Sequence, residues 1–514
     1  MGWDEFFGIR KENLKKAKEE LIGLLGEERV SDDPAILICY SHDFTPEAGR
    51  MPNLVVLPQT TEEVSEIVKI ANKYEIPVYV ITTGYNHGGM WIPRRGGIMI
   101  DLKKMDSVCE IDEESMTATL SPHVRIASLY EESNKRTSVD DIKLRPANPI
   151  TMGSVSMLSN YVSGGASHIA YKTGNHHENI VGMTWVMPDG SIVKTGTHSY
   201  PFRGKIPCLG PGPDVGGIFL ASQGSYGICT EITIKLFNEM PKEKLCAISQ
   251  EDIYSFDLEK ISEFFYKAGR ENFIHDFYKS GSRHGASVSF APVVEDVLDM
   301  QPVHVVVVTL TGIDDEEIQI KYERLQEIVN SIPGLMLLPD ESFELMVQAF
   351  NWDIEEAKRC LFKRLWRGNR VMRWRGSFQW VAFPSKFEHI PYLEKKIRDL
   401  IARYWIDTNP SLEPSRVPFQ VSLQGPFPMS RMIALEFDFW VDHTNPEEVK
   451  RTSMLFKKIV EEMIKEGAVV GRTVALSQEI QMPRLGIYHT LVKDIKKKLD
   501  PRNIMSPDTL PLGD

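Results

Sequence analysis

A glycine-rich loop between two short apolar strands constrains the fold of this chain more than any other stretch. The β-branched run at residues 78–81 stops at Thr82-Thr83-Gly84, and a second apolar run follows at residues 97–101. Glycines leave consecutive backbone N–H groups unobstructed by a Cβ atom, so such a loop can form a nest for an anionic group. The loop opens no long helix, unlike a dinucleotide fingerprint or a P-loop. On spacing alone it also fits a plain turn.

The segments around the loop predict an α+β module. Residues 53–58 are expected to form a buried strand, and residues 59–63 supply a cap and an acidic first turn for a helix that runs to about Tyr74. Strand, helix, strand, loop and strand therefore follow one another. We further expect strands at 110–112 and 117–120, a helix at 124–136, a hairpin at 184–194 with its turn at Asp189-Gly190, and a long strand that ends at 236.

Residues 149–170 are rich in glycine, serine and alanine. A low-bulk segment of this length lets the backbone approach a flat ligand or another backbone closely. A loose connector would have the same composition, and both interpretations stay open at this point.

The length of 514 residues argues for two or three domains. The composition changes near residues 237–244, after which strands alternate with amphipathic helices. These elements are expected at 303–310, 315–332, 380–383, 392–404, 433–439 and 445–466. We therefore divide the chain into an N-terminal part (1–238), a second α+β domain (239–468) and a C-terminal segment (469–514).

Composition excludes several classes of protein. A formal net charge of −12 argues against a nucleic-acid surface, which needs clustered Lys and Arg. The six cysteines are scattered without a C-x-x-C pair, so we interpret them as buried thiols and not as a disulfide scaffold or zinc site. No apolar run approaches the roughly 18 residues of a membrane helix, and the first residues lack the order of a signal peptide. A cytoplasmic location is the resulting prediction.

Several short motifs, in this order along the chain, resemble the vanillyl-alcohol oxidase / p-cresol methylhydroxylase (PCMH) family of FAD-linked oxidoreductases. They extend over nearly the whole chain from about Tyr40. The motifs are Pro58-x-Thr-x-Glu-Glu63, Thr83-Gly84-x-Asn86, Ile100-Asp-Leu-Lys-Lys-Met105, Pro188-Asp-Gly190, Lys194-Thr-Gly196, Tyr226-Gly-Ile-Cys-Thr230, Trp374-Arg-Gly376, Thr444-Asn-Pro-Glu-Glu448 and Leu499-Asp-Pro-x-Asn-Ile504.

The resemblance implies an α+β fold: a two-subdomain PCMH-type FAD-binding domain, made from residues 1–238 and 469–514, with an inserted α+β cap domain. It also implies that the glycine-rich loop holds the FAD pyrophosphate and that low-bulk segments line the rest of the cofactor. The protein would bury and tune the flavin, which carries the hydride chemistry. The predicted cofactor-binding residues are Thr82, Thr83, Gly84, Tyr85, Asn86, His87, Gly88, Gly89, Gly153, Ser154, Ser159, Asn160, Gly164, Gly165, Gly224, Gly227, Ile228 and Arg472.

Departures from the family pattern bear on the substrate and on the flavin linkage. Family members that oxidise para-substituted phenols hold the phenolate with two tyrosines and an arginine; here Arg472 remains, but Gly471 replaces the adjacent tyrosine. We take this as an argument against a simple 4-alkylphenol. Met372 stands where the methylhydroxylase has its flavin-linked tyrosine, and His87 lies one residue from the histidyl link of bicovalent relatives. We therefore predict dissociable FAD.

The predicted catalytic residues are Arg472, His87, His176, Arg375, Glu436 and Asp438. A histidine suits the acceptance of a hydroxyl proton near neutral pH. Glu436 and Asp438 alternate along one strand and so share a face, which makes them candidate bases on the cap side. Arg472 and Arg375 could bind an acidic group, and for each a structural ion pair is the alternative. The run Asn175-His-His-Glu178 is not interpreted as a metal site, because adjacent histidines in a loop point apart.

Two functions from different classes remain open at this point. The first is a flavin dehydrogenase or oxidase that removes hydride from an alcohol, a hydroxy acid or an activated benzylic carbon. Its electrons would pass to oxygen or to a protein acceptor, such as a cytochrome or an electron-transfer flavoprotein. The second is a flavoprotein subunit that relays electrons within a larger complex. A nicotinamide enzyme is disfavoured by the absence of G-x-G-x-x-G at a strand–helix junction. Relatives suggest a homodimer or a subunit of a complex.

Overall fold

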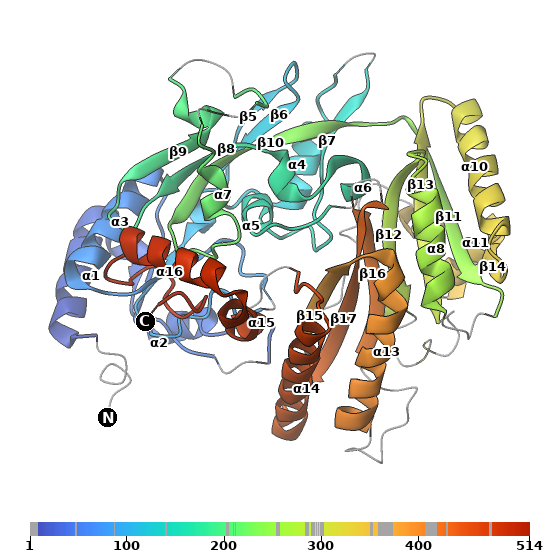
Figure 1. Ribbon diagram of the computed structural model, residues 1–514. Coiled ribbons are helices and arrows are strands. Elements are labelled where there is room, and N and C mark those ends of the chain that lie inside the picture. The colour runs from blue at the N-terminus through green and yellow to red at the C-terminus, as the bar shows by residue number, and fades with distance from the viewer. Residues whose placement is uncertain are drawn as a thin grey trace.

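The first layer of the molecule is a four-stranded sheet in the order β1-β2-β4-β3, in which β2 and β3 both run parallel to β4. Helices α1 and α3 cover one face of the sheet and pack on its apolar residues (Figure 1). The elements are α1 (Lys11–Leu25), β1 (Val30–Ser31), α2 (Pro34–Leu37), β2 (Leu54–Val56), α3 (Thr61–Tyr74), β3 (Val78–Ile81) and β4 (Ile98–Asp101).

The computed structural model describes residues 9–46, 49–86, 88–138, 141–167, 169–201, 205–208, 210, 212–252, 257–282, 287–288, 293–294, 296, 298, 303–349, 353–357, 374–406, 419–427, 430–471 and 475–513.

The second layer is a six-stranded antiparallel sheet whose long strand β10 pairs with β6, β7 and β8. Its apolar face packs against α4, α5 and the C-terminal helix α16. The predicted turn at Asp189-Gly190 joins β8 to β9. The elements are β5 (Val108–Asp112), β6 (Thr117–Leu120), α4 (Ile126–Ser133), β7 (Lys143–Pro146), α5 (Met157–Val162), α6 (Ala170–Thr173), β8 (Ile180–Val186), β9 (Ile192–Gly196), α7 (Gly216–Phe219) and β10 (Ile228–Glu239).

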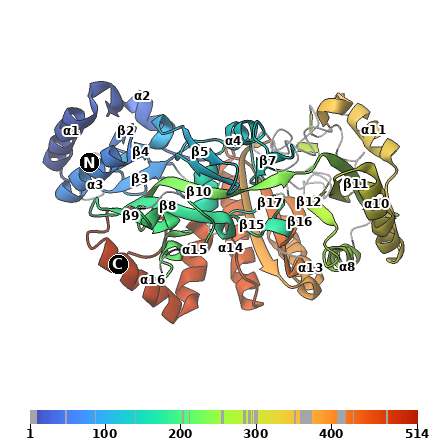
Figure 2. The ribbon, with the colours of Figure 1, turned by 90° about the horizontal axis from the view of Figure 1, so that it is seen from above.

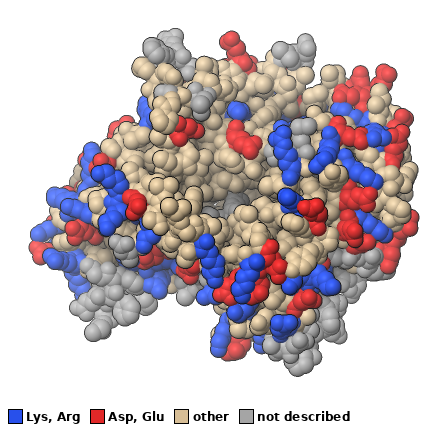
Figure 3. All heavy atoms as spheres, viewed as in Figure 1, with Lys and Arg blue, Asp and Glu red and all other residues tan. Residues whose placement is uncertain are grey.

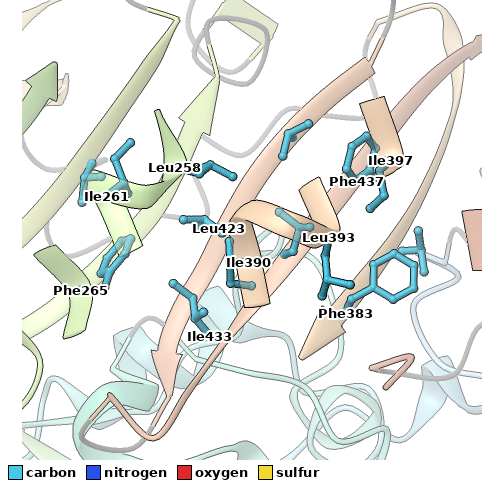
Figure 4. Packing of buried hydrophobic residues seen from close by; sticks show 14 of the residues in the cluster. Leu258, Ile261, Phe265, Phe383, Ile390, Leu393, Ile397, Leu423, Ile433 and Phe437 are labelled. Atoms are coloured by element: carbon cyan, nitrogen blue, oxygen red, sulfur yellow. The ribbon is translucent and has the colours of Figure 1, made fainter. Parts of the chain in front are cut away.

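A seven-stranded sheet in the order β14-β11-β13-β12-β16-β17-β15 forms the other half of the molecule (Figure 2). One of its faces is covered by α8, α10, α13 and α14, and Figure 4 shows aliphatic and aromatic side chains of α8 and α13 packing on those of β15, β16 and β17. The elements are β11 (Lys242–Gln250), α8 (Leu258–Ala268), β12 (Ile274–Ser282), β13 (His304–Gly312), α10 (Asp315–Asn330), β14 (Leu335–Leu337), α11 (Asp340–Ala349), β15 (Gly376–Ser385), α13 (Ile390–Ile401), β16 (Phe419–Phe427), β17 (Met432–Asp442) and α14 (Pro446–Lys465).

The passage from the first half to the second is a tight connection and not a linker. Strand β10 ends at Glu239 in the second sheet, and β11 begins at Lys242 in the third. The composition change near 237–244 therefore marks the point where the chain passes from the hydrophobic core of the second sheet to that of the third. This grouping supports the boundary at 238, which stays a proposal, as does the boundary at 468.

The C-terminal segment returns to the first half of the molecule through α15 (Ala475–Gln481) and α16 (Ile487–Leu499) (Figure 1). Beyond α16, Met505 pairs in parallel with Val78 of β3. Lys496 Nζ donates to Asp500 Oδ2 at 2.6 Å and to the Ser225 carbonyl at 2.8 Å. The tail therefore closes the sheet that the N-terminal residues began.

The predicted fold class is confirmed: the chain is α+β, with a third sheet and its helices inserted between the N-terminal part and its C-terminal return. The low-bulk stretch at 149–170 is not a loose connector, because it contains α5 and the start of α6. Among the described residues no helix is long and apolar enough to cross a membrane. Over the cap helices seen in Figure 3, acidic and basic side chains are interspersed.

Candidate flavin and substrate site

The glycine-rich loop leaves β3 at its carboxyl end. Gly84 has a φ of +76°, a conformation that L side chains rarely adopt, so the chain reverses there without strain. Within the described part of the chain, the backbone N–H groups of Thr83, Gly84 and Tyr85 donate no hydrogen bond. Three successive unfilled amides around a left-handed residue are suited to an anion nest, and the binding of the pyrophosphate there stays a prediction.

The second half of the loop is already satisfied by the protein itself. Asn86 Oδ1 accepts from the Gly88 N–H at 2.7 Å, and Asp43 Oδ2 accepts from the Gly89 N–H at 2.8 Å. Burial raises the pKa of the Asp43 carboxyl above its ordinary value. Gly88 and Gly89 were predicted to hold the cofactor through their amides, and the structure contradicts this because those donors are used. The nest is limited to the stretch before Asn86.

Helix α5 brings the small-residue segment against the loop. The Ser156 N–H donates to Thr83 Oγ1 at 3.1 Å, and Thr82 Oγ1 donates to Ser159 Oγ at 3.3 Å. Ser156 also caps α5, because its side chain accepts from the Ser159 N–H. Farther along, Gly164 has a φ of +71° and open space where a Cβ atom would lie. Two distant segments of the chain therefore lie against each other, and their joint contact with a cofactor stays a prediction.

One face of the cap sheet turns toward these segments. Glu436 and Asp438 lie on it, two residues apart on β17, and their side chains are 3% and 0% exposed. Their face also carries the buried rings of Phe378, Trp380 and Trp440, which pack with Ala170 of the first half. The opposite face of the same strand is purely apolar and fills the core under the helices. We call the face with the two carboxylates the roof.

A short segment that the sequence analysis did not single out connects the loop to the roof. The Phe44 N–H donates to the Asn86 carbonyl at 2.9 Å, and the Phe378 N–H donates to the Phe44 carbonyl at 3.0 Å. The Phe44 ring stacks on Tyr85 with 5.9 Å between centroids. Asp43 also accepts a hydrogen bond from the Gly89 N–H. Residues 43–44 therefore connect the glycine-rich loop to β15 through hydrogen bonds.

These residues fit a flavin nucleotide. The unfilled amides suit a pyrophosphate, the open space at Gly164 admits a ligand close to the backbone, and the aromatic roof suits a flat ring. In the described part of the chain, no three His, Cys, Asp or Glu side chains lie close enough to hold a metal ion.

Comparisons with known proteins agree with this assignment. A family model described as an FAD binding domain matches residues 52–196. The 4-cresol dehydrogenase [hydroxylating] flavoprotein subunit of Pseudomonas putida is 24% identical over 97% of this chain and 96% of its own length. The p-cresol methylhydroxylase crystal structure with substrate bound superposes with a TM-score of 0.80 at 22% identity, over 98% of this chain and 97% of the other. The chain therefore contains an FAD binding domain and is similar over nearly its whole length to PCMH-type FAD-linked oxidoreductases.

Two further comparisons cover different shares of the chain. The glycolate oxidase subunit GlcD of Bacillus subtilis (strain 168) is 30% identical over 46% of this chain, which spans 48% of that relative. The 4-ethylphenol oxidase of Gulosibacter chungangensis, in complex with isoeugenol, superposes with a TM-score of 0.81 at 21% identity, over 97% of both chains. FAD is the cofactor, and the protein is an FAD-linked oxidoreductase.

His176 was predicted to be catalytic, and its surroundings contradict this. The side chain is 0% exposed and its ring stacks on Tyr161 with 4.2 Å between centroids. Nδ1 lies 3.0 Å from Asn160 Oδ1, and Nε2 lies 3.1 Å from the Ala147 carbonyl oxygen. Both ring nitrogens have protein partners, so His176 has no nitrogen left for a substrate proton.

Arg375 was also predicted to be catalytic, with a structural ion pair as the alternative. Its Nη2 lies 2.6 Å from both carboxylate oxygens of Glu448, at the start of α14. Glu448 in turn accepts from the Asp442 N–H at 2.9 Å. Arg375 therefore clamps the end of the β15–β17 pair to α14, and the structural alternative holds.

Gly224 and Gly227 have reasons to be glycine that involve no cofactor. A Cβ atom on Gly224 would lie 2.7 Å from Ser506 Oγ of the tail, and one on Gly227 would lie 2.7 Å from the Val186 carbonyl oxygen. Ile228, at the start of β10, is buried in the core of the first layer. These three residues close the protein around the tail, so their predicted contact with FAD stays a proposal.

The other predicted cofactor-binding residues of the small-residue segment have protein contacts or are half-buried. The Gly153 carbonyl accepts from the Ala127 N–H at 3.0 Å, and the Gly165 N–H donates to the Asn160 carbonyl at 3.0 Å. Ser154 is half-buried beside them. Arg472 and His87 lie outside the described residues. Gly471, next to Arg472, donates its N–H to the Ala382 carbonyl at 2.8 Å at the edge of β15.

The sequence analysis missed Asp43, which holds the loop from 46 residues away. Its only local signal is an acidic residue within the polar stretch Tyr40-Ser-His-Asp43, and acidic residues in such stretches are usually solvated.

Proposed function

We propose that this protein is an FAD-dependent dehydrogenase or oxidase of aromatic substrates, which transfers a hydride from a CH–OH or activated benzylic carbon to flavin N5. The observation that carries the proposal is the roof, where Glu436 and Asp438 are buried among Phe378, Trp380 and Trp440. Buried carboxylates are rare without a role, and aromatic rings pack well on another aromatic ring.

In this proposal the aromatic and the acidic residues of the roof have different roles. The tryptophan and phenylalanine rings would hold the substrate ring by stacking and keep water out. Asp438, which is 0% exposed, would accept the substrate hydroxyl proton, and Glu436 would accept a second hydrogen bond from the substrate. The bound FAD would supply the hydride acceptor.

The comparisons support an aromatic substrate more than a hydroxy acid. Three of the proteins that match over the full length, cap included, carry names that refer to cresol or ethylphenol, and the two structures among them have TM-scores of 0.80 and 0.81. Two alkyldihydroxyacetonephosphate synthase structures also match over the full length, at lower TM-scores of 0.67 and 0.66. The glycolate oxidase subunit matches over less than half of this chain. Because Gly471 replaces a tyrosine that would hold a phenolate, we propose an aromatic or benzylic alcohol rather than a simple 4-alkylphenol. Arg472 would bind an anionic group on that substrate.

Reduced flavin has to pass its electrons on, and we propose a protein acceptor. The Pseudomonas putida relative is named a flavoprotein subunit, and several relatives of the FAD-binding half are D-lactate dehydrogenases whose names include a cytochrome. A flavoprotein relay without a small-molecule substrate is the alternative function.

The first experiment is anaerobic bleaching of the flavin by a panel of aromatic alcohols, 2-hydroxy acids and phenols. We expect an aromatic alcohol to reduce it. In D438N the rate of bleaching should fall about 100-fold or more with FAD content unchanged, because a positioned base contributes that much. E388Q is the matched control, since the Glu388 side chain is 71% exposed on the cap. If no compound bleaches the flavin while a reduced partner protein does, the relay is correct.

A further inference from the structure

Asn160 on α5 has one amide atom that no group in the described part of the chain fills. The residue is 7% exposed and follows Ser159, which contacts Thr82 at the start of the cofactor loop. One atom of its side-chain amide lies 3.0 Å from His176 Nδ1. Within the described chain, the other amide atom has no hydrogen-bond partner. The residue is buried but this amide atom is not among the fully enclosed unpaired atoms, so it is open to a ligand on the side where Ser159 contacts Thr82.

The ring of His176 determines which amide atom of Asn160 is the unused one. His176 Nε2 lies 3.1 Å from the Ala147 carbonyl oxygen, which can only accept, so Nε2 must carry a hydrogen. The ring is 0% exposed and stacked on Tyr161, and full burial disfavours a charged ring. A neutral imidazole with its hydrogen on Nε2 has only a lone pair on Nδ1.

The lone pair on Nδ1 requires a donor, and the only donor that a side-chain amide has is its NH2 group. The two ends of an asparagine amide have the same shape, so the hydrogen-bond network decides which end is which. The Asn160 NH2 therefore faces His176, and the Asn160 oxygen is the atom left without a partner in the described chain. A charged His176 would reverse the amide and present the NH2 group.

We propose that His176 is a positioning residue, which holds Asn160 with its amide oxygen toward FAD so that this oxygen accepts a hydrogen bond from an O–H or N–H group of the cofactor. The inference depends on FAD as the cofactor and not on the proposed substrate. In this proposal the ring nitrogens of His176 orient Asn160 and do not exchange a proton with the substrate. The backbone around it takes part, because the His176 N–H donates to the Gly165 carbonyl at 3.0 Å.

The first test observes the ring directly. In protein labelled with 15N-histidine, the His176 signals are assigned by their loss in H176Q. At pH 7.5, with and without FAD, we expect one protonated and one bare ring nitrogen, with the hydrogen on Nε2. Two protonated nitrogens, or a hydrogen on Nδ1 alone, would overturn the proposal. This measurement uses the wild-type chain, so it does not depend on any variant folding.

The second test measures FAD affinity of the apoprotein by flavin fluorescence. N160L should bind FAD about tenfold more weakly or worse, because it removes the acceptor. N179L is the matched control: Asn179 is 2% exposed in the same region, but its NH2 donates to the Thr173 and Asn175 carbonyls. We expect N179L to lower the melting temperature while leaving FAD affinity within about threefold. Equal FAD affinities for N160L and the wild type would refute the contact.

A rescue pair separates positioning from packing. In H176N the new amide lies near the position of Nδ1 and can accept from Asn160, whereas in H176Q the amide reaches toward the position of Nε2 and Ala147. Both variants lose the ring, so a merely structural role predicts the same loss of FAD affinity in both. We expect H176N to retain affinity within about threefold and H176Q to lose about tenfold. The reverse order would overturn the proposal.

Discussion

Single residues at this site act through the hydrogen bonds that they leave open or fill. Gly84 is the clearest case, because its φ of +76° exposes the adjacent amides and needs no side chain to be accommodated. Asp43 works in the opposite direction, since it fills the amide of Gly89. The length of the anion nest is therefore decided by Gly84, which exposes the amides before Asn86, and by Asn86 and Asp43, which fill the amides of Gly88 and Gly89.

The variant G84A tests the nest. A Cβ atom disfavours the left-handed backbone by roughly 1–2 kcal/mol, so we expect FAD to bind about tenfold more weakly, measured by titration of the apoprotein. G217A is the control, because Gly217 on α7 is exposed and nothing lies within 4 Å of its Cβ position. Equal FAD affinities for the two variants would show that the loop does not hold the cofactor.

His198 predicts acid sensitivity outside the site. It is buried against the second sheet, where Nε2 lies 2.7 Å from Thr233 Oγ1. Burial, reinforced by the nearby Lys205 charge, lowers the pKa of His198 to about 4. Between pH 6.5 and 4 the unfolded state then binds more protons than the native state, so stability falls as the pH falls through that window. Above pH 6.5 the contribution of His198 is constant.

Urea unfolding of H198Q checks this expectation. Between pH 7 and 4.5 the wild type should lose about 2.5 kcal/mol more free energy of unfolding than H198Q, which has no imidazole to protonate. Parallel pH profiles for the two proteins would rule His198 out as the cause.

At the scale of elements, the tail is what closes the cofactor half. Helix α16 and the residues after it reach β3 and the turn before β10 through the buried pair of Lys496 and Asp500, whose side chains are 4% and 0% exposed. Asp500 also accepts from the Ile504 and Met505 N–H groups. Lys496 on the helix therefore holds Asp500 in the position from which it binds the backbone of residues 504–505.

K496M should destabilise the protein by about 3–5 kcal/mol in urea unfolding, because it leaves the Asp500 carboxylate buried without its counter-charge. The double variant K496M/D500N should recover part of that loss, since no uncompensated charge remains. K498M, on the exposed side of the same helix, serves as the control. A K496M protein as stable as K498M would mean that the tail is held by packing alone.

At the scale of the whole molecule, the cap sheet and the cofactor half are connected at several separate places. Phe378 is bonded to Phe44, Gly471 lies on the edge of β15, and Tyr171 of α6 donates to the Gly269 carbonyl at 2.5 Å inside the cap. The roof is therefore fixed over the flavin site by contacts from three distant parts of the chain.

Whether the flavin is covalently linked is a property of the whole protein. Met372 and His87 lie outside the described residues, so the prediction of dissociable FAD depends on the sequence alone. We expect all flavin to leave the chain on SDS denaturation, because Met372 has no group that can form the link. The measurement is flavin fluorescence in the gel, and a fluorescent protein band would contradict the prediction.

Local patterns in the sequence were enough for the parts of the fold that depend on neighbours along the chain. Thr60 and Glu63 cap α3 as expected, with the Glu63 N–H donating to Thr60 Oγ1 at 3.1 Å. The alternation along β17 placed Glu436 and Asp438 on one face, because a strand has a period of two. The resemblance to the PCMH family supplied the cofactor and the inserted cap.

Only the tertiary structure decided what each polar side chain does. His176 and Arg375 were both expected to be catalytic. The ring nitrogens of His176 instead contact Asn160 and Ala147, and the Arg375 guanidinium is paired with Glu448, 73 residues away. Asp43 gave no signal because its partner lies across the loop. The periodicity of a strand or helix is written in adjacent residues, whereas a hydrogen bond between distant residues exists only once the fold has brought them together.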